Sequence, residues 1–181
     1  MQEPWAAATG LRVSELLGLR WQHICWKSET IYLNQTWVLG QTGTGKTESS
    51  RKPVPVGKRV AGFLKDWHRE TPYASPADWV FPSFKLSGRK PICGSQFTKD
   101  YLRPQFIEHG LIEPEYKGRA GLHAFRHSLS TVLITEGGTD PKTVQGLLRH
   151  ASAAITMDIY THAQDGAKRA AQARYESRLV Q

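Results

Sequence analysis

The sequence contains only two cysteines, Cys25 and Cys93, among its 181 residues. Two thiols are too few for a disulfide scaffold or a cysteine zinc site, and this scarcity favours a reducing compartment. The N-terminal residues show no basic segment before an apolar stretch, and no run reaches the roughly 18 apolar residues that a spanning helix needs. We therefore expect a cytoplasmic protein that is neither secreted nor inserted in a membrane.

Acidic residues are also few, because 16 Asp and Glu stand against 24 Lys and Arg, which gives a formal net charge of +8. A basic balance of this size favours a polyanionic partner, with nucleic acid ahead of a membrane surface. The six Trp, six Tyr and six Phe residues exclude a chain that is disordered throughout. The length can bury one substantial core, so we expect residues 1–181 to form a single domain.

Hydrophobic periodicity predicts a mixed fold that is mainly α-helical with a small antiparallel β-sheet or hairpin. Alternating residues predict strands over 31–39 and 54–56, joined by a long loop over 40–50, and a short extended piece over 79–81. Helix-period patterns and capping residues predict seven helices. They are expected at about 13–19, 60–69, 95–108, 122–136, 141–148, 153–159 and 166–179. In the fourth, one apolar face is expected to consist of Leu122, Phe125, Leu129, Val132 and Leu133.

Residues 40–47, GQTGTGKT, match the phosphate-binding pattern G-x-x-x-x-G-K-[ST] at every fixed position. That motif works by running directly into a helix whose N-terminal amides hold the phosphates. Here Pro53 and Pro55 follow closely and restore the period of a strand, which excludes such a helix. We therefore interpret the segment as the tip of a hairpin that carries Lys46, and we keep a nucleotide hydrolase only as the least favoured alternative.

His123 and Arg126 are three residues apart on the fourth predicted helix, so both side chains can point to one site. His127 lies four residues after His123, a spacing found in H-E-x-x-H zinc sites. Position 124 is Ala, however, so the general base of that motif is missing and no third ligand is indicated. We therefore expect no metal and no other cofactor.

Four segments together make the sequence resemble the catalytic domain of the tyrosine recombinases, also called phage-type integrases. They occur in the family's order along nearly the whole chain: ATGLRVSEL (8–16), KTESSRKPVPV (46–56), LHAFRHS (122–128), and LLRH (147–150) with YTH (160–162). The resemblance implies the fold of that catalytic domain. It also implies a metal-independent enzyme that breaks and rejoins DNA through a covalent 3′-phosphotyrosyl intermediate.

The same resemblance implies a role for each matching residue. The catalytic residues would be Arg12, Lys46, His123, Arg126, His150 and Tyr160. Residues expected to contact DNA are Arg12, Lys46, Arg51, Lys52, Arg126 and Arg149. Lys52 lies on the same hairpin as Lys46 and is the alternative lysine. Glu15 is expected to make an orienting or structural hydrogen bond, and Arg149 stands where relatives often have glycine, a departure that we do not expect to affect the chemistry.

The chemistry explains why these residue types are needed. A tyrosine with a pKa near 10 needs a proton acceptor or a cationic field to attack phosphorus at neutral pH, and His123 is the favoured assistant. Two guanidiniums can meet the charge that grows on the non-bridging oxygens, which suits Arg12 and Arg126. A lysine among phosphate-bound cations can protonate the departing 5′-oxygen.

Members of this family usually carry a separate core-binding domain before the catalytic one, and the sequence shows neither that domain nor a clamp around DNA. We expect an isolated catalytic domain with weak, salt-sensitive, largely non-specific binding to double-stranded DNA. The family also implies self-association on DNA, a tetrameric synapse in full-length members, with the helix at about 166–179 docking on a neighbour. A DNA-binding relic without a competent site and a type IB topoisomerase remain alternatives.

Overall fold

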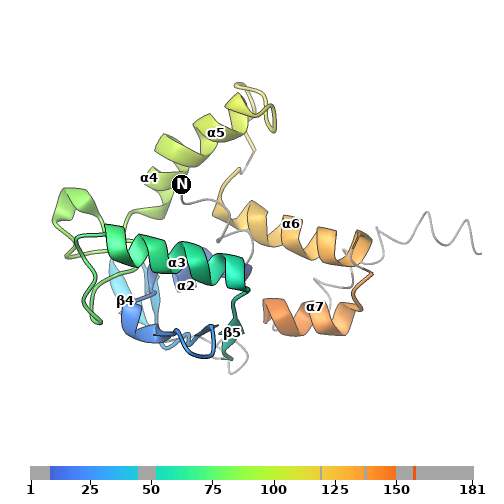
Figure 1. The fold of residues 1–181 in the computed structure, drawn as a ribbon. Helices are drawn as coiled ribbons and strands as arrows, with labels where there is room; N and C mark the ends of the chain where they lie inside the picture. Colours follow the sequence, from blue (N-terminus) through green and yellow to red (C-terminus); the bar gives the residue numbers. More distant parts are fainter. Residues whose placement is uncertain (1–8, 45–51, 119, 137, 150–156, 158–181) are drawn as a thin grey trace, which may run out of the picture.

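The structure is a computed structural model, and it describes residues 9–44, 52–118, 120–136, 138–149 and 157 (Figure 1). Helices surround two small antiparallel sheets, as the fold class predicted from the sequence requires. The elements in chain order are α2 (Val13–Leu17), η1 (Trp21–His23), β1 (Ile24–Cys25), β2 (Thr30–Ile31), β3 (Thr36–Val38), β4 (Gln41–Gly43), β5 (Val54–Pro55), α3 (Lys58–Glu70), η3 (Phe84–Leu86), α4 (Gly94–Phe97), η4 (Thr98–Leu102), α5 (Arg103–Glu108), α6 (Leu122–Thr135) and α7 (Pro141–Leu148).

The first sheet has the strand order β1-β2-β5, and both pairings are antiparallel. Ile31 of β2 pairs with Ile24 and Val54, and all three side chains are buried. These residues belong to the main core, which also receives Leu16 and Leu17 from α2. The sheet therefore supports the short helix that begins directly after Arg12.

The sequence predicted one hairpin over 31–56, and the structure corrects this prediction. β2 does pair with β5, but β3 turns back at once to pair with β4, whose residues we had placed in the loop. The turn between β3 and β4 consists of Leu39 and Gly40, both with positive φ, which is the turn geometry that two-residue hairpins favour. A leucine at such a position is unusual, which explains why the turn was not predicted.

Helix α3 packs one face on the main core, where Val60, Ala61 and Leu64 are buried (Figure 1). Its last turn donates a hydrogen bond from the indole of Trp67 to the carbonyl of Val80, at 2.7 Å. Residues 71–93 are largely irregular, and the predicted extended piece begins at Trp79, which forms an isolated bridge with Arg20.

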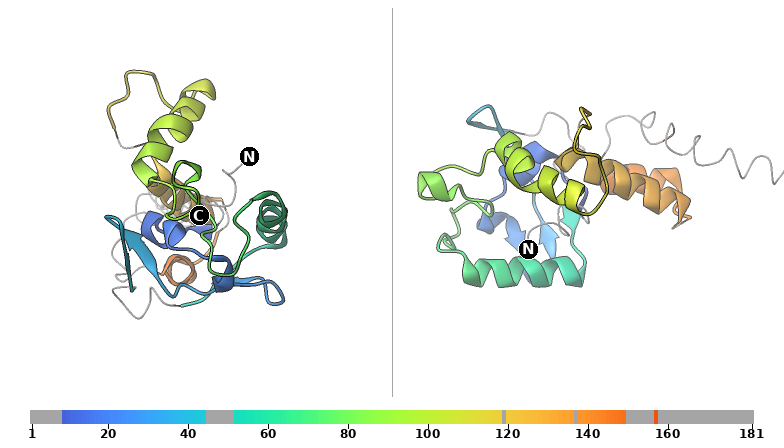
Figure 2. Two further views of the ribbon diagram at one scale, coloured as in Figure 1. Left: turned by 90° about the vertical axis from the view of Figure 1, so that its left-hand side faces the viewer. Right: turned by 90° about the horizontal axis from the view of Figure 1, so that it is seen from above.

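Helix α4, the π-helical turn η4 and helix α5 follow one another without a break. Together they confirm the helix predicted over 95–108, and they project away from the sheets in the views of Figures 1 and 2. Phe106 of α5 packs edge-on against Phe125 of α6, with ring centroids 5.6 Å apart.

Helices α6 and α7 lie side by side and enclose a second, smaller core of Ile134, Val144 and Leu148 (Figure 2). The predicted start of α7 is confirmed, because Asp140 accepts a hydrogen bond from the backbone N–H of Thr143 and Pro141 is the first helical residue.

The predicted apolar face of α6 is partly wrong. Val132 is 45% exposed, whereas the buried residues recur every four positions. They are Leu122, Arg126, Ser130 and Ile134. Two of these four buried residues are polar, so hydrophobic spacing could not identify this face of the helix. The same face brings Arg126 into the interior.

No membrane-spanning helix occurs within the part of the chain that the structure describes. The helices predicted at about 153–159 and 166–179 lie outside the described residues.

Candidate active site

Arg12 is the residue directly before α2, and Glu15 in the first turn of that helix fixes its position. One carboxylate oxygen, Glu15 Oε2, accepts the backbone N–H of Arg12 at 2.9 Å, and the other, Oε1, accepts Arg12 Nη1 at 2.8 Å. Glu15 is buried, with 2% of its side chain exposed, while one third of the Arg12 side chain remains accessible. Glu15 thus has the orienting role expected from the sequence, and it leaves Arg12 partly open to a ligand.

Arg126 reaches the same place from the buried stripe of α6. Its Nη1 donates to the carbonyl of Gly10, and its Nη2 donates to the carbonyl of Leu148 at the end of α7. Burial, reinforced by the charge of Arg12, lowers the pKa of Arg126 to about 10. The side chain therefore stays charged at neutral pH, although its surroundings disfavour the charge.

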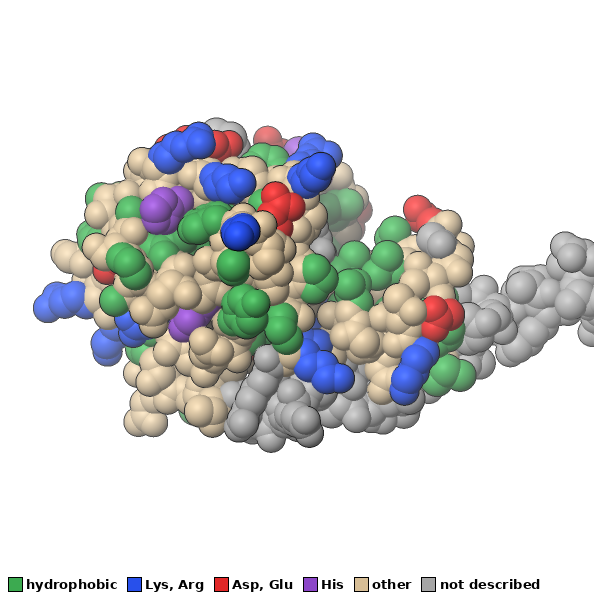
Figure 3. Space-filling model, turned by 60° about the horizontal axis from the view of Figure 1, so that its bottom comes forward, with side chains coloured by type: hydrophobic (Ala, Val, Ile, Leu, Met, Phe, Trp, Pro, Cys, Tyr) green, Lys and Arg blue, Asp and Glu red, His purple; other side chains and the backbone are tan. Residues whose placement is uncertain are grey.

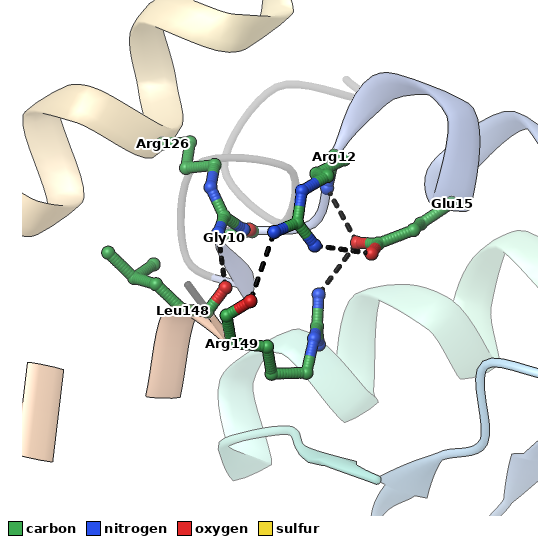
Figure 4. A network of polar contacts seen from close by, with 6 residues as sticks. All are labelled: Gly10, Arg12, Glu15, Arg126, Leu148 and Arg149. Carbon is green, nitrogen blue, oxygen red and sulfur yellow. Dashed lines mark hydrogen bonds and ion pairs between the residues drawn. The ribbon is translucent and has the colours of Figure 1, made fainter. Parts of the chain in front are cut away.

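Figure 4 shows the two guanidiniums next to each other at the C-terminal end of α7. Arg12 Nη2 donates to the carbonyl of Arg149 at 3.0 Å, one residue beyond the carbonyl that Arg126 uses. The last carbonyls of a helix have no partner inside the helix and form the negative end of its dipole. They therefore offset part of the repulsion between two arginines that come from segments 114 positions apart.

Arg149 completes this network in a way that the sequence did not predict. Its Nη2 donates to Glu15 Oε2 at 2.6 Å, and its side chain is 1% exposed. We expected Arg149 to contact DNA, and the structure corrects this expectation because the guanidinium is enclosed and paired with a carboxylate. Its backbone carbonyl, rather than its side chain, reaches Arg12.

His123 lies one turn before Arg126 on α6, and its side chain faces solvent beside the two arginines. Partial burial lowers the pKa of the His123 imidazole, and the positive charges of His127, Arg126 and Arg12 lower that pKa further. The ring of His127 meets that of His123 edge-on, with centroids 4.9 Å apart. A histidine held neutral beside two cations can accept a proton, which is what the sequence assigned to His123.

The structure thus brings together three of the six residues predicted to be catalytic: Arg12, His123 and Arg126. The other three, Lys46, His150 and Tyr160, lie outside the described residues, as does Arg51. Lys52 is described, and it is exposed just before β5.

Two backbone groups of this site could not be identified by residue type, namely the carbonyls of Gly10 and Leu148. The sequence contains one signal for these contacts, namely the glycine at position 10. Gly10 has a φ of +60°, a conformation that glycine adopts far more easily than other residues. A Cβ at Gly10 would also lie 2.5 Å from Leu148 Cδ2. Gly10, two residues before Arg12, therefore permits the close approach of α7.

Among the described residues, no group of three or more His, Cys, Asp or Glu side chains could hold a metal ion. Within residues 40–44 and 52–57, the described part of the chain around the phosphate-loop pattern, no helix occurs. Residues 41–43 form strand β4, and the next described segment leads into strand β5 rather than a helix. The arrangement therefore favours a cationic site that binds an anion over a nucleotide-hydrolysing loop.

Comparisons with known proteins agree on one group of relatives. A family model described as the phage integrase family matches residues 4–167. The tyrosine recombinase XerC of Escherichia coli O127:H6 (strain E2348/69 / EPEC) is 30% identical over 154 residues, a match that covers 84% of this chain and 44% of the relative. XerC of Escherichia coli strain K12 / DH10B shows the same values. The chain thus spans less than half the length of these curated relatives.

Solved structures show the same fold. The integrase of the transposon Tn1549, in complex with a circular intermediate DNA, superimposes with a TM-score of 0.74 at 23% identity, covering 94% of this chain and 57% of that one. The crystal structure of XerA recombinase gives a TM-score of 0.62 at 24% identity, covering 94% of this chain and 54% of that one.

Proposed function

Because the chain belongs to the phage integrase family, we propose that it is the catalytic domain of a site-specific DNA recombinase that works through a covalent 3′-phosphotyrosyl intermediate. The observation that carries this proposal is the adjacency of Arg12 and Arg126 on the end of α7. The sequence-based interpretation required these two arginines to share one pocket, and side chains facing opposite ways would have contradicted it.

The electrostatics of the pair support a phosphate ligand. Two guanidiniums side by side repel each other, and the lowered pKa of Arg126 reflects both that repulsion and its burial. Folding alone gains little from such an arrangement, whereas an anion that binds both groups offsets its cost. Perturbed charged groups of this kind are concentrated at functional sites.

In the proposed reaction, the phenolic oxygen of Tyr160 attacks the phosphorus of a DNA backbone phosphate. A Tyr–O–P bond forms while the bond from phosphorus to the 5′-oxygen breaks, so the 3′-phosphate stays attached to the protein. The phenolic proton passes to His123, and Lys46 protonates the departing 5′-oxygen. No water is consumed, so the reverse reaction with a 5′-hydroxyl rejoins the strand.

The two arginines serve the transition state. Negative charge increases on the non-bridging oxygens as the fifth bond to phosphorus forms, and paired guanidinium donors meet that charge without ever losing their own. Loss of one preorganised donor of this type costs about 2.7 to 4 kcal/mol of barrier, which is far more than an exposed ion pair contributes. We assign His150 a hydrogen bond to one of these oxygens.

We propose double-stranded DNA as the substrate and self-association of the chain on that DNA. We also propose that the protein acts in the cytoplasm, in association with the nucleoid. The net charge of +8 supports a polyanionic partner. On the face shown in Figure 3, the lysine and arginine side chains are spread out rather than gathered in one patch. The argument for a phosphate ligand therefore rests on the adjacent guanidiniums of Arg12, which is partly accessible, and Arg126, which is buried, more than on surface charge. We also propose that DNA contacts Lys46, Arg51 and Lys52, of which Lys46 and Arg51 lie outside the described residues.

The decisive test is a suicide-substrate reaction, in which a nicked duplex oligonucleotide traps the covalent adduct. We expect the native chain to form an adduct that is stable to denaturant and Tyr160→Phe to form none. Tyr101→Phe is the matched control, because Tyr101 is an exposed ring stacked on Phe97 and loses only its hydroxyl. An adduct in Tyr160→Phe contradicts the nucleophile assignment. Binding without any adduct from the native chain favours the DNA-binding relic instead.

A further inference from the structure

Arg149 occupies a position that suits a glycine. It ends α7 with a φ of +53°, in the left-handed region that other residues adopt at a cost. Its side chain is nevertheless buried, and within the described part of the chain two of its guanidinium groups, Nε and Nη1, have no hydrogen-bond partner. Both features oppose folding, so stability alone does not explain why an arginine stands here.

The charges around Glu15 suggest what the arginine does. Glu15 Oε1 contacts Arg12 Nη1 at 2.8 Å, and Glu15 Oε2 contacts Arg149 Nη2 at 2.6 Å. Arg12 and Arg149 contact this single carboxylate, and Arg126 lies on the other side of Arg12, so the cluster carries two net positive charges (Figure 4). Without Arg149, one of those two charges would be lost, because Glu15 would then neutralise Arg12.

We propose that Arg149 is a positioning residue that neutralises Glu15 and thereby leaves the charge of Arg12 available to a phosphate group. The proposal rests on the phosphate-binding role given above to Arg12 and Arg126, and it extends that role to a side chain that never touches the ligand. Glu15 can then orient Arg12 through its two hydrogen bonds without cancelling its charge.

The alternative is that Arg149 only fills space and anchors α7. A buried ion pair is weak support for stability, since apolar residues of similar volume often replace such pairs without loss. An anchoring role also predicts a residue whose donors are all satisfied. Arg149 does not fit an anchoring role. Within the described residues two of its guanidinium groups have no hydrogen-bond partner, and its backbone conformation is one that glycine would adopt without strain.

The test is a double-mutant cycle that varies the net charge of the cluster, and the measured quantity is the affinity for inorganic phosphate. NMR shifts of the guanidinium N–H groups report phosphate binding. Arg149→Met removes one positive charge, and we expect it to bind phosphate about tenfold more weakly, as loss of one nearby charge implies. The double variant Glu15→Gln/Arg149→Met restores the two net charges, and its affinity should return to within about threefold of the native chain. If the double variant binds no better than Arg149→Met, charge compensation is wrong.

Two further variants keep the test valid if Arg149→Met does not fold. Arg149→Lys retains the charge and one donor for Glu15, so its phosphate affinity should stay within about threefold of native. Glu15→Gln raises the cluster to three net charges and should bind phosphate more tightly than the native chain. Weaker binding by both variants, with melting temperatures unchanged, overturns the proposal.

Arg69→Met is the matched control, because it also leaves a carboxylate, that of Asp66, without its arginine, but in an exposed pair. It should not change phosphate affinity. These measurements do not depend on Tyr160 or on strand cleavage. A native chain that binds phosphate but forms no covalent adduct therefore contradicts the proposed recombinase and not this inference. If the native chain binds no phosphate, the inference falls whatever the adduct assay gives.

Discussion

Arg12 and Arg126 donate hydrogen bonds to consecutive carbonyl oxygens, those of Arg149 and Leu148, where helix α7 ends. Because these carbonyls have no partner inside the helix, the end of α7 holds both guanidiniums in place. The site is therefore positioned by backbone atoms as much as by side chains.

The first prediction concerns the shape of Arg126. A lysine keeps the charge, but its three N–H donors sit on one nitrogen, and it lacks the planar fork whose two nitrogens let Arg126 reach the carbonyls of Gly10 and Leu148 separately. We expect Arg126→Lys to lower the single-turnover rate of adduct formation by about 10² to 10³, the usual effect of removing one preorganised donor. The measurement is the rate constant of covalent trapping on a nicked oligonucleotide.

Arg103→Lys is the control for this change, since Arg103 also donates to two carbonyls, those of Pro114 and Tyr116, but in an exposed segment. Its rate of adduct formation should equal that of the native chain. If both lysine variants react at the native rate, the paired donors of Arg126 do not contribute to the reaction.

The sequence predicted this site unevenly, for physical reasons. Arg12, His123 and Arg126 were predicted because the family resemblance rests on two motifs that contain them, at 8–16 and 122–128. The role of Arg149 was not found, because the same side chain serves equally well to contact DNA or to pair with Glu15. The structure shows the second outcome, because the Arg149 side chain is 1% exposed and its Nη2 donates to Glu15 Oε2.

The fold shows a similar division. Helices α3 and α7 were predicted almost to the residue, since hydrophobic period and capping act locally. The pairing of β2 with β5 was predicted, whereas the β3-β4 hairpin was not, because its tight turn places Leu39 at a positive φ that the residue type does not indicate. The buried stripe of α6 contains Arg126 and Ser130, so its burial could not be predicted from hydrophobicity.

The second prediction concerns Gly10. Gly10→Ala places a methyl group 2.5 Å from Leu148 Cδ2, on a backbone with a φ of +60°, and so pushes α7 away from the carbonyl that binds Arg126. Gly110→Ala is the matched control, because Gly110 has a φ of +65° and open space around its Cβ position. The control should lose about 1 kcal/mol, or about 2–4 °C in melting temperature.

Gly10→Ala should lose more, by about 1–3 kcal/mol of overpacking strain, and should also form adduct more slowly. Differential scanning calorimetry and covalent trapping measure the two effects. Equal melting temperatures for the two variants contradict the close packing of Gly10 on α7.

The third prediction is a pH dependence. Partial burial and the neighbouring charges of His127, Arg126 and Arg12 lower the pKa of His123, so this imidazole is neutral at pH 7 and able to accept the tyrosine proton. Adduct formation should therefore fall only when the pH drops through that lowered pKa, below the ordinary value of about 6.5. His127→Asn removes one of the charges that lower the pKa of His123, so the acid limb should move to higher pH. A limb that stays in place, or moves to lower pH, shows that His123 is not the proton acceptor.

The last prediction separates phosphate contact from general attraction to DNA. If this chain contacts DNA mainly through the phosphate backbone, duplexes of different sequence should bind with similar affinity, and that affinity should fall steeply with salt. If Arg12 contacts a phosphate, Arg12→Met should weaken binding to all sequences alike and reduce the slope of log affinity against log salt by about 1. Arg69→Met, which removes an exposed arginine on α3, should leave that slope unchanged. The two variants have the same net charge, so a difference between their slopes can only come from where the charge lies. Fluorescence anisotropy at several salt concentrations measures both slopes, and equal slopes place the ligand somewhere other than at the end of α7.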